Sequence, residues 1–199
     1  MCEVKGRIGY RGYTKGDLVN KGEGAITLSP SNIKNNTFNI DKCTYISWFK
    51  YDESPEIKVY DGDVLFVKTG STYGKVAIVN ELKEKATINP QFVIFKEIKC
   101  SNKFLFYNLI TKNFKAKIES IVGGTATPTI SQANLNKQTV NVPSLEKQEK
   151  IVEILDILDN HIQSLLISYE EELKNLEELK KSILQKAFEG ELTNKSVAV

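Results

Sequence analysis

Short apolar runs recur through roughly the first 140 residues and are separated by turn residues. They are rich in β-branched and aromatic side chains, which favour strands. The runs are Ala25–Leu28, Tyr45–Phe49, Ile57–Tyr60, Val64–Val67, Val76–Val79 and Phe92–Phe95. Asp61–Asp63 (DGD) predicts a hairpin turn between two of them, and Thr139–Val142 predicts a closing strand. The pattern therefore predicts a body that is mostly β.

A helical spacing replaces this pattern from Phe104 to Val122, so the predicted fold class is α+β. Pro143 then ends the body. Ser144 is placed to cap a further helix, and Glu146 falls in its first turn, where negative charge is favourable. We therefore expect two domains, residues 1–143 and residues 144–199.

The second domain carries one apolar stripe at alternating steps of three and four residues. The stripe consists of Ile151, Leu155, Leu158, Ile162, Leu165, Tyr169, Leu173, Leu176, Leu179, Ile183 and Ala187. The slip near Tyr169–Leu173 is typical of a coiled-coil seam with a stutter. Gly190 is a natural helix stop. A helix of about 45 residues is roughly 65 Å long, and such a stripe predicts a partner helix.

Charge divides the chain at the same place. Residues 1–143 contain 20 Lys and Arg against 13 Asp and Glu, a net charge of +7, whereas residues 144–199 contain 7 against 12, a net charge of −5. The basic body could face phosphate, and the acidic helix could not face it broadly.

The cysteines and the apolar content bear on the compartment. Cys2, Cys43 and Cys100 are odd in number and fit no zinc or redox spacing, so we expect reduced thiols. No apolar run approaches the roughly 18 residues of a membrane span, and MCEVKGRIGY lacks a signal-peptide core. These features predict a cytoplasmic protein.

Lys5–Leu18 is a glycine-rich loop in which basic residues alternate with tyrosines. Glycine lets backbone approach a ligand, arginine can read guanine or hold phosphate, and tyrosine can bond phosphate or stack. The candidate nucleic-acid contacts here are Arg7, Tyr10, Arg11, Tyr13 and Lys15. The alternative is a surface loop with solvated charges.

Lys68–Lys75 (KTGSTYGK) connects two predicted strands. It resembles a phosphate loop, but only three residues separate its glycines and Val76 replaces the magnesium-binding hydroxyl. The remaining interpretation is a hairpin tip that contacts nucleic-acid backbone, and the alternative is a hairpin without a ligand. The candidate contacts are Lys68, Ser71, Thr72, Tyr73 and Lys75.

Catalytic constellations are absent from the sequence. The one histidine, His161, lies on the predicted helix, and there is no His/Cys cluster for a metal. Asn89–Phe92 (NPQF) is only a partial echo of an amino-methyltransferase motif. A standalone nuclease or methyltransferase is therefore disfavoured.

Four stretches together resemble the DNA specificity subunit of type I restriction–modification systems. They are GDVLFVKTGSTYGKVAIV, GGTATPTISQANL, VNVPSLEKQEKIVEILDILDNHI and LKKSILQKAFEGEL. The resemblance covers nearly the whole chain, and the order of the four stretches makes it specific. In that family a target recognition domain reads one half of a split DNA site and hands over to a long spacer helix.

The resemblance implies a function for the small residues at Gly123–Leu135. They would fold back against the domain and keep backbone amides and hydroxyls near DNA, with Thr125 and Gln132 as further candidate contacts. The alternative is a tight buried turn that needs small residues for packing.

The resemblance also implies partners. We expect double-stranded DNA, a second copy paired antiparallel through the seam, a modification subunit docked on the helix, and a restriction subunit in the complex. No cofactor is expected in this chain; S-adenosylmethionine, ATP and magnesium would serve the partner subunits.

Two departures from the family pattern are visible. Full-length members have two recognition domains and two spacer helices, so this chain resembles a half-subunit. The family's strand with an LGD-like sequence is missing before CEVKGRIGY, which suggests a split or truncated gene. The rival interpretation is a coiled-coil protein–protein adaptor without DNA affinity.

Overall fold

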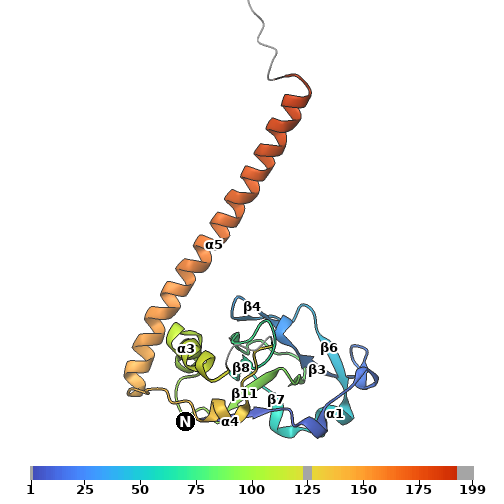
Figure 1. Cartoon of the computed structure of the whole chain (residues 1–199), viewed down its shortest axis with the longest axis vertical. Helices are drawn as coiled ribbons and strands as arrows, with labels where there is room; N and C mark the ends of the chain where they lie inside the picture. Colours follow the sequence, from blue (N-terminus) through green and yellow to red (C-terminus); the bar gives the residue numbers. More distant parts are fainter. Residues whose placement is uncertain (1, 123–126, 192–199) are drawn as a thin grey trace, which may run out of the picture. The chain divides into compact units, whose positions relative to one another are not determined.

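The computed structural model describes residues 2–122 and 127–191. It divides into two compact units, Met1–Val152 and Glu153–Val199. Among the described residues, the first unit holds all the strands, and the second holds a single stretch of helix that ends at Phe188 (Figure 1). The α+β fold class expected from the sequence is confirmed.

Two sheets and a small ribbon build the first unit. The four-stranded sheet has the order β1-β11-β8-β9, all antiparallel: β1 (Glu3–Gly6), β11 (Phe92–Lys96), β8 (Val64–Val67) and β9 (Val76–Ile78). The five-stranded sheet has the order β2-β6-β3-β10-β7: β2 (Leu18–Val19), β6 (Thr44–Ser47), β3 (Gly24–Leu28), β10 (Ala86–Ile88) and β7 (Lys58–Val59). The ribbon pairs β4 (Ile33–Lys34) with β5 (Thr37–Phe38).

Helices complete the unit. The short 3-10 turns are η1 (Gly9–Arg11), η2 (Lys15–Asp17), η3 (Pro30–Asn32) and η4 (Pro55–Ile57). The α-helices are α1 (Trp48–Asp52), α2 (Asn102–Ile110), α3 (Lys112–Val122), α4 (Gln132–Asn136) and α5 (Leu145–Phe188), which runs on into the second unit.

The four-stranded sheet is buried on both faces. On β8, Leu65 and Val67 join a core cluster with residues of the five-stranded sheet, whereas Val64 and Phe66 join a second cluster with α2, α3 and α4. Successive side chains of a strand point to opposite faces. Both faces of β8 are therefore apolar, which explains why VLFV is a continuous apolar run instead of an alternating one.

Three of the predicted elements are wrong in detail. Tyr45–Phe49 is strand only as far as Ser47, because the Ser47 hydroxyl accepts a hydrogen bond from the Lys50 amide (3.4 Å) and starts α1. The turn at Gly62 (φ +89°) joins two different sheets, since β7 pairs with β10 while β8 pairs with β11 and β9. Thr139–Val142 forms no strand.

The predicted helical stretch Phe104–Val122 is confirmed, but as two helices. Thr111 lies between α2 and α3 in an extended conformation (φ −63°, ψ 147°). Its hydroxyl accepts a hydrogen bond from the Phe114 amide (3.2 Å) and donates one to the Asn108 carbonyl (2.8 Å). One side chain thus ends the first helix and starts the second.

α5 is 44 residues long and begins just after Ser144, as predicted. Gly190 (φ +80°) follows its end. At its start, the buried Gln148 accepts a hydrogen bond from the Ser101 amide (2.9 Å) and donates one to the Pro143 carbonyl (2.8 Å), which ties the first turns to the body. The predicted seam from Leu158 to Ile183 is about half exposed throughout.

Candidate nucleic-acid interface

One edge of the four-stranded sheet gathers the predicted loops. The end of β1 at Gly6 pairs with Val93, and the end of β8 at Val67 pairs with Phe92. The start of β9 at Val76 pairs with Phe66. The loop after β1, the loop 68–75 between β8 and β9, and the segment before β11 therefore leave the sheet at the same edge, which we call the loop edge.

The loop 68–75 is a hairpin connection, as predicted, with a fixed backbone. The Lys68 amide donates to the Gln91 carbonyl (2.8 Å), and the Gly74 amide donates to the Val67 carbonyl (2.9 Å). Gly70 (φ +101°) and Gly74 (φ +83°) occupy positions that L side chains rarely adopt. Ser71 is exposed at the tip and Thr72 is partly exposed beside it.

The chain after Pro128 folds back onto this loop, as expected. The Gly70 amide donates to the Pro128 carbonyl (3.2 Å), and the Ile130 amide donates to the Lys68 carbonyl (2.9 Å). Thr69 and Thr129 form a bridge, and the Ile130 side chain is buried. Two motifs some 60 residues apart in sequence thus share one surface. Thr125 lies outside the described residues.

Lys68 and Lys75, the two lysines of loop 68–75, are both partly buried. Burial lowers the pKa of Lys68. Lys75 donates from Nζ to the Ile33 carbonyl (3.4 Å), so its ammonium lies over the β4–β5 ribbon. Both cations lie at the loop edge.

Tyr73 faces inward, unlike its neighbours. Its ring packs against Phe66 in a T-shaped arrangement with 6.1 Å between the ring centroids, and its hydroxyl is buried with no hydrogen-bond partner in the described structure. Burial, together with the nearby negative Glu119, raises the pKa of Tyr73 to about 12. In this conformation Tyr73 packs the core behind the loop.

Arg7 is a structural residue in this fold. Its side chain is 6% exposed and lies over the Tyr13 ring at 5.3 Å. It donates to the Ile88 carbonyl (3.1 Å) and the Thr87 hydroxyl (3.1 Å), and burial lowers the pKa of its guanidinium. These hydrogen bonds link the chain just after β1 to β10. The placement of Arg7 therefore gives no support to a DNA contact.

The rest of the N-terminal loop is more open. Arg11 forms an ion pair with Glu56 at 3.3 Å, which fastens η1 to η4. Tyr13 is partly exposed and its hydroxyl accepts a hydrogen bond from Thr27 (3.4 Å). Lys15 is exposed on η2. The Tyr10 side chain lies outside the described part of the structure.

Gln132 serves packing as well. Its Nε2 donates to the Val4 carbonyl (2.6 Å), while the Val4 amide donates to Asn136 Oδ1 (3.3 Å). Both backbone groups of Val4 on the outer edge of β1 are satisfied by α4. Gln132 therefore helps to close a sheet edge, and a DNA contact by this residue stays a prediction.

Sequence reasoning missed the β4–β5 ribbon, which forms another wall of the loop edge. Asn36 Oδ1 accepts a hydrogen bond from the Val76 amide (3.4 Å). Both turn residues are left-handed, Asn35 at φ +52° and Asn36 at φ +60°. The dipeptide Asn35-Asn36 between Ile33-Lys34 and Thr37-Phe38 is a type of two-residue hairpin signal that could have identified it.

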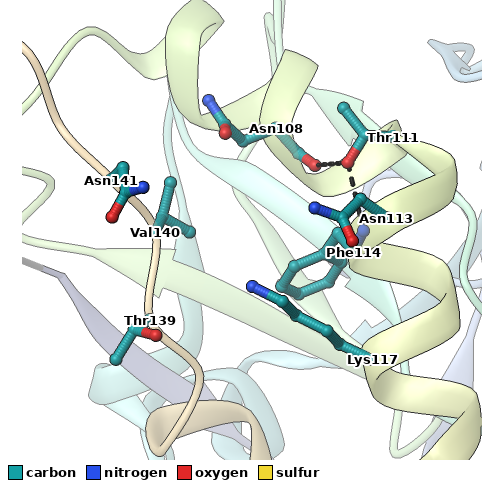
Figure 2. A pocket seen from close by; sticks show the side chains of 8 residues that line it. All are labelled: Asn108, Thr111, Asn113, Phe114, Lys117, Thr139, Val140 and Asn141. Carbon is teal, nitrogen blue, oxygen red and sulfur yellow. Dashed lines mark hydrogen bonds between the residues drawn. The ribbon is translucent and has the colours of Figure 1, made fainter.

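A polar pocket of about 160 Å³ lies elsewhere on the first unit, between α2, α3 and the segment 139–141. Figure 2 shows Lys117 and Asn113 extending toward it from α3, opposite Thr139 and Asn141. None of its eight lining residues is acidic, and none is histidine or cysteine. The lining offers hydrogen bonds and one positive charge, but no general base.

Within residues 2–122 and 127–191, no group of three His, Cys, Asp or Glu side chains could hold a metal ion. No helix of the described chain is long and apolar enough to cross a membrane.

Comparison with known proteins gives a consistent result. Residues 11–175 match the family model described as type I restriction modification DNA specificity domain. The type I restriction enzyme MjaVIII specificity subunit of Methanocaldococcus jannaschii is 27% identical over 148 residues, which are 72% of this chain and 34% of that protein. The EcoDI specificity subunit of Escherichia coli is 32% identical over 95 residues, or 48% of this chain and 21% of that protein.

Solved structures share the fold. A chain from a structure described as the basis of complex assembly and conformational transition of the type I R-M system has a TM-score of 0.71 at 19% identity, covering 94% of this chain and 43% of that one. The HsdS subunit from Thermoanaerobacter tengcongensis has a TM-score of 0.63 at 19% identity, covering 95% and 43%. This chain thus spans less than half of each of these proteins.

Proposed function

The chain belongs to the type I restriction modification DNA specificity domain family, and from this premise we propose that it reads one half of a bipartite DNA target. The observation that best supports the proposal is that two separate segments meet at the loop edge. Loop 68–75 and the segment 127–131 are hydrogen-bonded together there, with lysines and exposed hydroxyls and without a catalytic constellation.

The loop edge has the groups that DNA backbone requires. Lysines neutralise phosphates, and hydroxyls and backbone amides bond phosphate oxygens. Lys68 and Lys75 would supply the charge, and Ser71 with Thr72 the hydroxyls. Lys15 and Arg11 would extend the contact along the N-terminal loop, with Arg11 oriented by Glu56. These groups position a duplex but carry little sequence information.

We propose that this chain is not itself an enzyme. Methyl transfer and cleavage would belong to modification and restriction subunits, which would use S-adenosylmethionine, ATP and magnesium. The assembly would act in the cytoplasm.

α5 would join two copies. Its seam residues, such as Leu158 at 50% and Leu165 at 55% exposure, leave an apolar stripe uncovered. An antiparallel pairing with a second copy would cover it and restore two recognition domains. Ile154 and Ile157 are also exposed, and Ile157 lies about 100° around the helix from Leu158. They widen the apolar surface beyond one seam, which would leave room for a modification subunit.

Duplex binding as a function of salt tests the proposal. Lys68→Ala and Lys75→Ala should each weaken binding and flatten the salt slope by about 0.9 for each phosphate that is no longer neutralised, measured by fluorescence anisotropy. Lys83→Ala is the matched control, because Lys83 is exposed beyond the opposite end of β9. Equally weakened binding in all three variants would mean that the loop edge is not the interface.

A second candidate is a protein–protein adaptor. Phe49 is 73% exposed and Trp48 is 43% exposed on α1, and exposed aromatic side chains are enriched at protein interfaces. This function predicts no salt-dependent duplex binding by the unaltered chain.

A further inference from the structure

The β4–β5 ribbon is a narrow element with an unusual tip. Ile33 pairs with Phe38 and Lys34 with Thr37, which leaves a turn of two residues. Both of these, Asn35 and Asn36, have positive φ. Glycine is the usual residue for such positions and asparagine tolerates them. The turn therefore retains two carboxamide side chains where glycines would leave none.

The base of the ribbon is rigid. Ile33 and Phe38 are buried in the core cluster between the sheets. The Asn32 side chain, 1% exposed, donates to the carbonyls of Asn39 and Lys42, both at 3.0 Å. The Asn39 amide donates back to the Asn32 carbonyl (2.8 Å). A ribbon clamped in this way loses little conformational entropy on binding a ligand.

The two asparagines of the tip have different environments. Asn36 is occupied inside the molecule, because its Oδ1 accepts the hydrogen bond from the Val76 amide. Asn35 is exposed, and its carboxamide has no hydrogen-bond partner among the described residues. Asn36 therefore fixes the ribbon to β9, whereas Asn35 presents an unused donor and acceptor to solvent.

Positive charge surrounds this tip. Lys34 is on the ribbon and exposed, and Lys75 reaches across to the Ile33 carbonyl. In the connection from Ser29 to Cys43, Lys34 and Lys42 are accompanied by a single acidic residue, Asp41, which accepts a hydrogen bond from Asn39 (2.8 Å). The ribbon can therefore approach a polyanion with cations on its flanks.

From this geometry we propose that the β4–β5 ribbon enters the major groove and that Asn35 determines specificity at one base pair, by pairing with an adenine. The major groove admits a two-stranded ribbon, and a carboxamide matches the N6 donor and N7 acceptor of adenine. The inference rests on the proposed function. It assigns base reading to a segment distinct from loop 68–75, whose lysines and hydroxyls contact backbone.

Selection from a random duplex library by the full-length chain tests the assignment. Asn35→Gly removes the carboxamide and tolerates the left-handed backbone. We expect the adenine preference to fall by about 5- to 150-fold at one position, with the other positions unchanged. Asn80→Gly, which alters an exposed asparagine just beyond the other end of β9, should keep every preference.

Asn35→Asp guards against a folding artefact. Aspartate also tolerates positive φ, but its carboxylate accepts only, which suits the N4 amino group of cytosine. The expected result is a switch from adenine to cytosine at the same position, and misfolding cannot produce a new preference. Unchanged preferences in both variants would overturn the role of Asn35. Absence of duplex binding by the unaltered chain would instead overturn the proposed function.

Discussion

At the scale of single residues, the Tyr73 hydroxyl destabilises the folded state. It is buried without a partner in the described structure, and burial of an unpaired hydroxyl costs about 1–3 kcal/mol. The ring offsets this cost by packing against Phe66 and the cluster beneath α3. The aromatic ring, and not the hydroxyl, stabilises the base of loop 68–75.

Tyr73→Phe should therefore leave the free energy of unfolding unchanged or raise it by about 1 kcal/mol. The folded pKa of about 12 exceeds the ordinary value of 10.0, so the folded state keeps a proton that the unfolded state releases. The stabilisation linked to this proton is complete below about pH 10 and declines as pH rises toward 12. The variant should show a shallower alkaline decline in urea unfolding. A marked loss of stability at neutral pH would mean that the hydroxyl has a partner.

Residue type alone does not predict which basic or polar side chains the fold uses for internal hydrogen bonds. Arg7 and Gln132 have the chemistry of DNA contacts, yet the fold uses Arg7 to join β1 to β10 and Gln132 to close β1. Such roles depend on carbonyls more than 80 residues away in sequence, at Ile88 and Val4. Lys15 and Ser71, in contrast, lie where local turn signals predicted exposure.

At the scale of elements, the sequence predicts the features that depend on residues close together in the chain. The hairpin from β8 to β9 and the start of α5 follow from turn and capping residues near them in sequence. The prediction of a hairpin at DGD is wrong because the two flanking strands belong to different sheets. β7 pairs with β10 and β8 pairs with β11, and the local turn sequence does not determine these distant pairings. The β4–β5 ribbon was not predicted because each of its strands has only two residues, and alternation of apolar and polar positions cannot be recognised over two residues.

The α5 seam leads to a prediction about assembly. Leu158→Asp plus Leu165→Asp should convert a dimer to a monomer in light scattering, since pairing would bury two charges in an apolar seam. Ser164→Asp plus Ile167→Asp is the matched control. Ile167 is 66% exposed and lies about 200° around the helix from Leu165. A mass that both double variants leave unchanged would contradict pairing through this stripe.

At the scale of the whole molecule, helix length bears on the proposed target. Two identical domains joined by antiparallel helices would require an inverted repeat with an unread gap, because a two-fold axis relates the domains. α5 has 44 residues and would set that gap.

Four residues inserted between Tyr169 and Leu173, where the seam slips, lengthen a helix by about 6 Å. Each base pair adds about 3.4 Å, so the preferred gap should grow by one or two base pairs while the bases read stay the same. Methylation by the reconstituted complex on a library of gap lengths measures this shift. An insert that preserves the dimer and leaves the preferred gap fixed would refute control of the gap by α5.

The closure of β1 by α4 has a consequence for synthesis on the ribosome. β1 is made before the other strands of this unit, but it pairs with β11 at residues 92–96, and Val4 receives its outer hydrogen bonds from Gln132 and Asn136. The nascent chain must therefore keep β1 unpaired until β11 has also left the ribosome. Native contacts at such sequence separation form slowly, since loop closure precedes them. Of the strands in this unit, β1 is thus among the last to be fixed, once Asn136 has left the exit tunnel.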